Sequence, residues 1–119
     1  MKIVVTSSGD GLGSPVDPRF GRAARLVLID TDRNTVQGFD NTQNMQLAQG
    51  AGLQAAATVA NLGADCLITG NCGPKAFQAL QAAGVTVVTG ASGTVKGALD
   101  DYRAGRLQPA RAANVEGHW

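Results

Sequence analysis

Three apolar stretches of the chain end in the same way, and this repetition constrains the fold more than any other feature. They read VVTSSGDG from Val4, LITGNCGP from Leu67 and VVTGASGT from Val87. Each has two apolar residues, a threonine, a small residue and then a loop that contains glycine. Short apolar runs that stop at turn residues are typical of buried strands. We therefore predict three similar, parallel strands, each followed by a pliable loop.

The rest of the pattern predicts an α/β domain with a five-stranded mixed sheet and helices packed on its faces. Two apolar runs around the polar turn DTDRNT indicate a hairpin, and the later strands alternate with helices. We expect a single domain over residues 1–106 and a flexible tail over residues 107–119, which show no clear period. The expected strands cover 2–6, 25–30, 35–40, 65–69 and 85–89, and the expected helices cover 52–61, 74–83 and 94–104.

Composition narrows the classes of partner. The 119 residues are 44% apolar and 16% charged with a net charge of +1, which argues against nucleic acid or a membrane surface as the partner. Aromatic residues make up 4%, too few for a platform that stacks on single strands. No run approaches the roughly 20 apolar residues of a membrane span, and the N-terminal run is too short for a signal peptide. We therefore expect a cytoplasmic protein.

The three glycine-containing loops predict a ligand crevice. In an open α/β sheet, ligands bind at the carboxyl ends of the parallel strands, which is where these loops begin. Ser8, Asn71, Gly73 and Ser92 lie in the loops and are candidate contacts. The alternative is that short connections need glycine for their geometry alone. The likeness of all three loops favours the crevice.

Two lysines indicate that the ligand is an anion. Lys75 follows Pro74 in the first turn of one predicted helix, and Lys96 follows the predicted cap Thr94 in the first turn of another. A cation there opposes the helix dipole at a cost of roughly 0.3–1 kcal/mol. Together with free backbone N–H groups, the two lysines would form an anion cradle. The alternative is that solvent screens two ordinary exposed lysines.

The segment SPVDPRFGRA would complete the rim of this crevice. Arg19 and Arg22 place two cations near the first loop, and we predict that Phe20 anchors the segment on the core. The alternative for Asp17 is a simple ion pair with one of the arginines. The segment therefore adds two candidate cofactor-binding residues.

The two cysteines differ in their expected roles. Cys66 lies within an apolar strand, where a free cysteine behaves as a small buried hydrophobe. Cys72 precedes a helix start near Lys75, an environment that lowers a thiol pKa, so it is our candidate metal ligand. Zinc takes about four nitrogen or sulfur ligands, and the chain adds only His118 in the tail. An anion site with Cys72 as a secondary contact is therefore favoured over a bare metal site.

Several of these segments together carry a resemblance to a known family. KIVVTSS, then VDPRFGRA, then LITGNCGPKAFQALQAAGVTVVTG resemble, in this order, the dinitrogenase iron–molybdenum cofactor biosynthesis family. The likeness covers roughly residues 1–106 and is most specific in DPRFGRA and GPKAF. Length and single-domain form are most similar to the orange-protein branch of sulfate-reducing bacteria.

The resemblance implies a ribonuclease H-like fold and binding of a cluster rather than catalysis. The implied cargo is an anionic molybdenum–sulfur cluster, either a molybdenum–copper sulfide held without covalent links or a related molybdenum–iron–sulfur cluster. The implied role is a carrier or scaffold that works with unidentified donor or acceptor proteins. Some relatives carry histidines in the loop after the third strand. Here that loop offers Asn41, Asn44, Gln46 and Gln49.

Two other functions have to be compared with this interpretation. A two-metal nuclease needs clustered carboxylates, whereas Asp10, Asp17, Asp30, Asp32 and Asp65 are scattered over loops and turns. We therefore expect no enzyme. A regulatory protein that binds a nucleotide, a phosphate or another small molecule without metal is the stronger alternative, because the same cradle would accept a phosphate.

Overall fold

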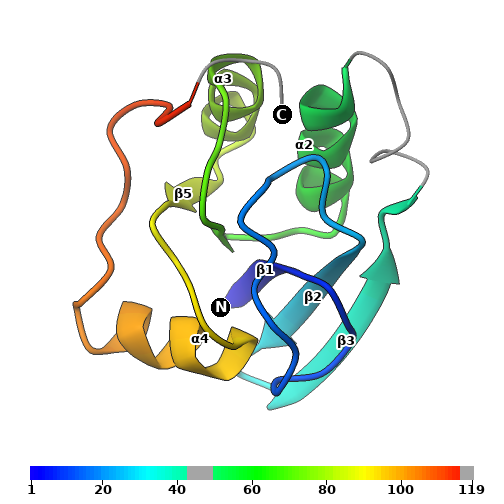
Figure 1. Cartoon of the computed structure of the whole chain (residues 1–119), viewed down its shortest axis with the longest axis vertical. Helices are drawn as coiled ribbons and strands as arrows, with labels where there is room; N and C mark the ends of the chain where they lie inside the picture. Colours follow the sequence, from blue (N-terminus) through cyan, green and yellow to red (C-terminus); the bar gives the residue numbers. More distant parts are fainter. Residues whose placement is uncertain (43–49, 116–119) are drawn as a thin grey trace.

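A five-stranded mixed sheet forms the centre of the protein in a computed structural model, which describes residues 1–42 and 50–115 (Figure 1). Its strands follow the order β3-β2-β1-β4-β5 across the sheet. β1 pairs with β4 in parallel and β4 with β5 in parallel, whereas β2 runs antiparallel to both β1 and β3. The strands are β1 (Lys2–Ser7), β2 (Arg25–Asp30), β3 (Thr35–Asp40), β4 (Cys66–Ile68) and β5 (Thr86–Val88). The predicted fold class, α/β with a mixed five-stranded sheet, is confirmed.

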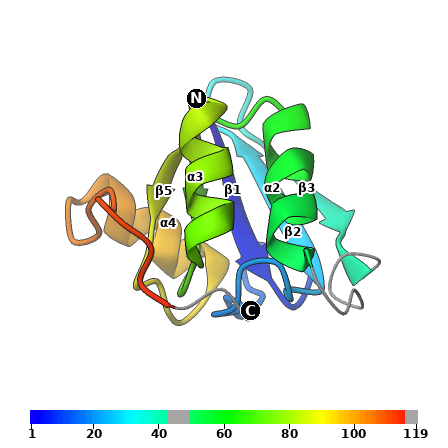
Figure 2. The same ribbon diagram turned by 90° about the horizontal axis from the view of Figure 1, so that it is seen from above.

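Helices cover both faces of the sheet, as predicted. They are α2 (Ala51–Asn61), α3 (Pro74–Ala82) and α4 (Val95–Arg103). Figure 2 shows α2 and α3 on one face and α4 on the other. Alternate residues of β1, β2, β4 and β5 therefore enter two separate cores. The core under α2 and α3 contains Val4, Leu67 and Val87, and the core under α4 contains Ile3, Val5, Cys66, Ile68 and Val88.

Local sequence explains where the helices begin and end. α3 begins at Pro74, whose missing N–H and fixed φ suit a first helical position. Thr94 caps α4, because its Oγ1 accepts a hydrogen bond of 3.1 Å from the Gly97 N–H. Gly84 and Gly105 follow the ends of α3 and α4 with φ of 80° and 79°, a region that glycine enters at no steric cost. The predicted helix boundaries agree with the structure to within one residue.

The segment after α4 returns to the sheet and lies along its β5 edge. The Ala110 N–H donates a 2.7 Å hydrogen bond to the Val87 carbonyl, and Pro109 lies opposite Val88 in an antiparallel bridge. Figure 1 shows this stretch, orange to red, running from α4 towards α3. The flexible tail over 107–119 stays a prediction, as does the single domain over 1–106. Within that tail, the stretch around Ala110 is bonded to β5. No helix in the described part of the chain is both long and apolar enough to cross a membrane.

Candidate functional site

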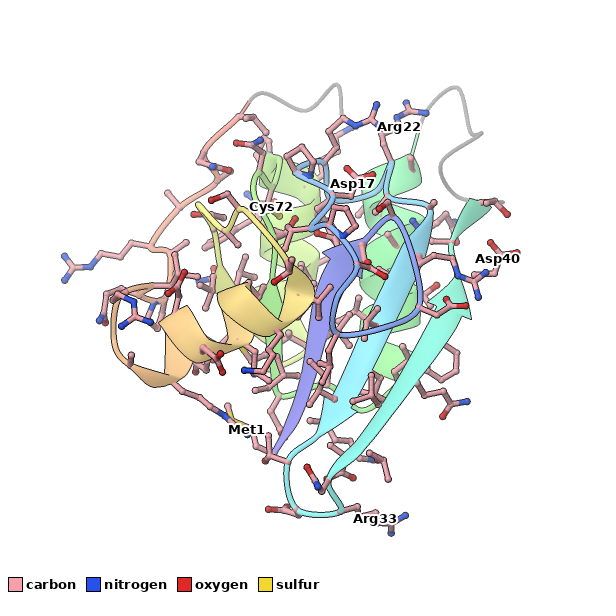
Figure 3. All side chains as sticks on the ribbon, turned by 60° about the horizontal axis from the view of Figure 1, so that its bottom comes forward. Met1, Asp17, Arg22, Arg33, Asp40 and Cys72 are labelled. Carbon is pink, nitrogen blue, oxygen red and sulfur yellow. The ribbon has the colours of Figure 1, made fainter. Side chains whose placement is uncertain are left out.

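The three repeated loops meet at one edge of the molecule, which we call the loop edge and define as residues 8–22, 69–75 and 89–94. Backbone hydrogen bonds join its parts: Val16 N–H to Gly93 O at 2.8 Å, and Gly90 N–H to Gly70 O at 2.9 Å. Figure 3 shows Asp17, Arg22 and Cys72 at this end of the molecule, and Met1 and Arg33 at the opposite end. The predicted gathering of the loops at the carboxyl ends of β1, β4 and β5 is therefore observed.

Residues 17–20, which we call the DPRF segment, pair directly with the loop after β4. Asn71 donates its N–H to the Pro18 carbonyl at 2.7 Å and accepts the Phe20 N–H at 3.1 Å. A Cβ on Gly70 would lie 2.7 Å from the Pro18 Cα, so only glycine allows this approach. Phe20 is 1% exposed and packs in the core under α2 and α3, as predicted. Arg19 is thereby fixed beside Asn71.

The start of α3 offers backbone donors to a ligand. Gly73 is its N-cap, and no side chain of the described residues caps the helix. Among residues 1–42 and 50–115, the N–H groups of Lys75 and Ala76 meet no hydrogen-bond acceptor. The Lys75 side chain is exposed and makes no ion pair with any described residue. The predicted combination of a lysine with free N–H groups is present at this helix.

The start of α4 differs, and here the prediction of free N–H groups is wrong. The loop after β1 folds over this helix, so that Val95 N–H donates to Ser14 O at 2.9 Å and Lys96 N–H donates to Leu12 O at 2.8 Å. The Lys96 Nζ lies 2.9 Å from Asp100 Oδ2, one turn along the helix. This hydrogen bond lowers the pKa of the Asp100 carboxyl. The N–H groups and the lysine that we predicted to bind an anion are therefore bonded to groups of the protein itself.

The prediction that the Cys72 pKa is lowered is also wrong. The residue is fully buried in the core under α2 and α3, and burial raises the pKa of its thiol to about 12. The side chain points into this core, and its Sγ lies 3.7 Å from the carbonyl oxygen of Gly73. Cys66 is buried as predicted, and burial raises its pKa to about 11. Both thiols are free. Ligation of a metal by Cys72 stays a prediction.

The other candidate residues lie on the loop edge and differ in their exposure and their hydrogen bonds. Arg19 is exposed, with its Nε 3.5 Å from Asp17 Oδ1, and Arg22 is half-buried. Ser8 and Ser92 are exposed, although Ser8 donates its N–H to Pro15 O at 3.1 Å. Gly73 is buried. No three histidine, cysteine or acidic residues of the described ranges are grouped to hold a metal ion.

Part of the loop after β3 and part of the C-terminal tail lie outside the described residues. Asn44, Gln46, Gln49 and His118 belong to the ranges 43–49 and 116–119, which the structure does not describe. Asn41 is described and is 1% exposed; its Nδ2 donates to Ala23 O at 2.8 Å. That side chain therefore supports the backbone between the DPRF segment and β2.

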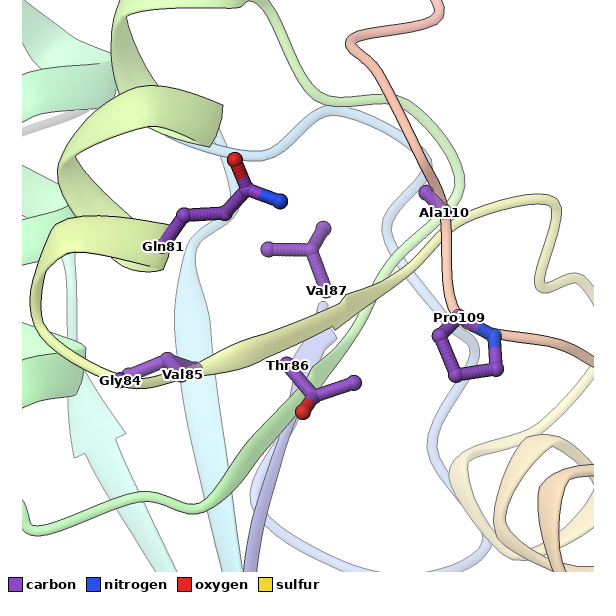
Figure 4. Close-up of a pocket in the computed structure, with 7 residues that line it drawn as sticks. All are labelled: Gln81, Gly84, Val85, Thr86, Val87, Pro109 and Ala110. Carbon is purple, nitrogen blue, oxygen red and sulfur yellow. The ribbon is translucent and has the colours of Figure 1, made fainter.

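A shallow hollow of about 350 Å³ lies away from the loop edge. Figure 4 shows it beside β5, between Gln81 of α3 and the segment at Pro109 and Ala110. Val85 and Thr86 line it at the beginning of β5, whereas the candidate loops follow the ends of the strands. Because its position and lining share nothing with the loop edge, we do not assign the ligand to it.

Sequence reasoning missed one residue that contacts the site. Asn114 lies in the segment predicted to be a flexible tail, yet its side chain bonds to the backbone of Gly70 and Cys72. No periodicity or motif marks this position, because its partners lie more than 40 residues earlier. A single asparagine in a loop does not indicate by itself which distant residues it contacts.

Comparison with known proteins gives consistent results. The family model described as dinitrogenase iron-molybdenum cofactor matches residues 1–105. The apo form of the orange protein from Desulfovibrio gigas has a similar structure, with a TM-score of 0.92 and 44% identity over 96% of each chain. A Thermotoga protein of the DUF35 family has a TM-score of 0.84 and 34% identity over 98% of each chain.

A curated relative shares the family resemblance at a lower identity. An uncharacterized protein of Methanocaldococcus jannaschii is 22% identical over 95 residues, which make up 78% of this chain and 80% of that protein. The family model spans nearly the whole described chain, and the Desulfovibrio gigas structure is 44% identical. The chain therefore belongs to the dinitrogenase iron–molybdenum cofactor family, as the sequence motifs predict.

Proposed function

We propose that the protein binds an anionic molybdenum–sulfur cluster at the loop edge, without covalent links, and acts as a carrier or scaffold rather than an enzyme. The cluster is cargo, received from a donor protein and passed to an acceptor in the cytoplasm. Membership of a family named for an iron–molybdenum cofactor supports molybdenum and sulfur as its constituents. The second metal is copper or iron, and the proposed contacts centre on Lys75.

The open start of α3 is the observation that carries this proposal. A helix N-terminus has a partial positive charge and N–H groups that point along the axis, which together favour an anion. Here the N–H groups of Lys75 and Ala76 have no acceptor within residues 1–42 and 50–115, and Lys75 adds a full charge. A sequence selected only for stability would place an acidic or capping residue at this helix start.

Neighbouring groups extend the positive surface from this helix. Arg19 is bridged to Asn71, four residues before Lys75, and its side chain is exposed. Metals in a sulfide cluster are already bonded to sulfur, so the protein supplies shape, hydrogen-bond donors and charge rather than a complete ligand set. The relative at 44% identity is described in an apo form, which supports a ligand-bound form for that fold.

Amide chemical shifts would test the proposal against binding of a phosphate. Tetrathiomolybdate with copper(I) is titrated into the ¹⁵N-labelled protein, and inorganic phosphate is titrated separately. We expect the Lys75 and Ala76 amide signals to shift with the thiomolybdate mixture and to stay shifted when excess phosphate is added. Displacement by phosphate, or shifts with phosphate alone, would instead support the metal-free regulatory protein.

A further inference from the structure

The C-terminal segment contacts residues 70–72, which we call the ligand loop, through the side chain and the backbone N–H of Asn114. The Asn114 Oδ1 accepts the Cys72 N–H at 2.8 Å, and its Nδ2 donates to Gly70 O and to Asn71 Oδ1, each at 3.1 Å. The Asn114 N–H donates to Cys72 O at 3.2 Å. One residue from the tail therefore contacts all of residues 70–72.

These bonds fix the polar groups of a loop that the rest of the fold leaves partly unsupported. Cys72 is fully buried, so its N–H and carbonyl both need partners, and Asn114 supplies both. An asparagine amide is suited to this task because it presents an acceptor and two donors in one plane. Aspartate keeps the acceptor but cannot donate, and alanine offers neither.

Asn114 is held in place from outside the loop. Four residues earlier, the Ala110 N–H is bonded to Val87 O on the sheet edge, and Ala110 and Ala113 both pack against the core under α2 and α3. The tail therefore reaches the loop from a fixed anchor. Because Cys72 is followed directly by the Gly73 cap of α3, the position of Cys72 sets where the open helix start lies.

We propose that Asn114 is a positioning residue for the ligand loop, which holds residues 70–72 so that the open N–H groups of α3 and the side chain of Lys75 face the ligand together. This inference rests on the proposed function for the identity of the ligand. The bonds themselves are a property of the ligand-free protein, so the two claims are tested by separate measurements. Asn114 acts through the loop backbone rather than by touching the cluster.

The experiment compares Asn114→Ala and Asn114→Asp with the control Gln108→Ala in the full chain. Gln108 lies in the same segment, but within residues 1–42 and 50–115 its side chain bonds locally, to Gly105 O at 2.7 Å. The first measurement is amide hydrogen exchange at Cys72 in the ligand-free protein. We expect about tenfold faster exchange in Asn114→Ala, the effect of one lost hydrogen bond. Asn114→Asp should also exchange faster than the wild type, because it keeps the acceptor for the Cys72 N–H but turns its second carboxylate oxygen towards the acceptor oxygens of Gly70 and Asn71.

The second measurement is retention of the cluster formed from tetrathiomolybdate and copper(I), followed by its absorption after desalting. We expect about tenfold faster release from Asn114→Ala and wild-type release from Gln108→Ala, with both variants folded by circular dichroism. Unchanged exchange at Cys72 in Asn114→Ala would overturn the inference. So would faster exchange with wild-type or slower release, because the loop would then bind without being held. A wild-type protein that retains no cluster overturns the proposed function and, with it, the positioning of the loop for that ligand, whereas the exchange result still shows whether Asn114 holds residues 70–72.

Discussion

The side-chain oxygens of Thr6 and Thr69 lie 2.8 Å apart, and both residues are completely buried where β1 and β4 end side by side. The Thr6 hydroxyl also lies 2.7 Å from the carbonyl oxygen of Asp17. A hydroxyl has one proton to donate, so Thr6 donates to Asp17 and accepts from Thr69. The threonine that recurs in the repeated strand endings therefore links two parallel strands to the DPRF segment.

This chain of hydrogen bonds predicts that two similar substitutions lower the free energy of unfolding by different amounts. Thr6→Val leaves both the Asp17 carbonyl and the Thr69 hydroxyl without partners, so we expect the free energy of unfolding to fall by about 1–3 kcal/mol. Thr69→Val leaves the bond to Asp17 intact and should cost less, about 0.5–1.5 kcal/mol. Urea unfolding measures both values. The exposed Thr86 is the matched control, and Thr86→Val should change stability by less than about 0.5 kcal/mol. Equal losses of stability in Thr6→Val and Thr69→Val would contradict the assignment of Thr69 as the donor to Thr6.

Gly70→Ala should disrupt the pairing between the DPRF segment and the loop after β4. The new Cβ would lie 2.7 Å from the Pro18 Cα and 2.9 Å from its carbonyl oxygen, and backbone atoms cannot move aside cheaply. We expect a loss of about 1–3 kcal/mol in the free energy of unfolding. Gly13→Ala is the control, because its Cβ would meet nothing within 4 Å and its φ is not positive. A Gly70→Ala protein as stable as this control would show that the two segments are not in close contact.

The fold is readable from this sequence because its signals are local. Short apolar runs that stop at turn residues predict the strands, Pro74 and Thr94 predict helix starts, and glycine predicts the helix ends. The site is less readable, because its properties depend on which segments fold over one another. No local rule states that carbonyl oxygens of the loop after β1 will accept the N–H groups at the start of α4, or that Cys72 will be buried. The contact of Asn114 cannot be predicted for the same reason, since its partners lie more than 40 residues earlier in the chain.

Charge reversal at the two lysines should now give different results. Lys75→Glu places a favourable charge at the open start of α3, so we expect the ligand-free protein to gain roughly 0.3–1 kcal/mol in the free energy of unfolding. Cluster retention should fall sharply, because an attraction becomes a repulsion. Lys96→Glu removes the ion pair with Asp100 and sets two carboxylates one turn apart, which offsets the gain from the helix dipole.

Thermal melts and retention assays on both lysine variants would check this difference. We expect Lys96→Glu to melt close to the wild type and to retain most of the cluster. If Lys96→Glu lost the cluster as completely as Lys75→Glu, the start of α4 would have to belong to the site despite its satisfied N–H groups.

The buried thiols predict that stability falls in alkaline solution. Burial raises the pKa of Cys72 from 9.0 to about 12 and that of Cys66 to about 11. Unfolded thiols ionise above pH 9 while the folded ones stay protonated. Their contribution is therefore fully present below pH 9 and is lost as the pH rises towards the folded pKa values.

Urea unfolding between pH 8 and 10.5 measures this effect. The decline should be less steep in Cys72→Ala, which lacks one of the two titrating groups. The native thiols should also resist alkylation at pH 8 and react once the protein is unfolded. Rapid alkylation of Cys72 in the native protein would mean that its thiol is accessible and ionised, and would support its predicted role as a metal ligand.

Metal analysis after assembly is the sharpest test of whether the loop edge binds a molybdenum–sulfur cluster. The protein is mixed with tetrathiomolybdate and copper(I), or with zinc alone, then desalted, and the bound metals are measured beside the absorption spectrum. We expect a coloured protein that retains molybdenum with a second metal. Cys72→Ala should keep both metals, and Lys75→Glu should lose them. A colourless protein without molybdenum that binds zinc at micromolar concentration would contradict the proposal.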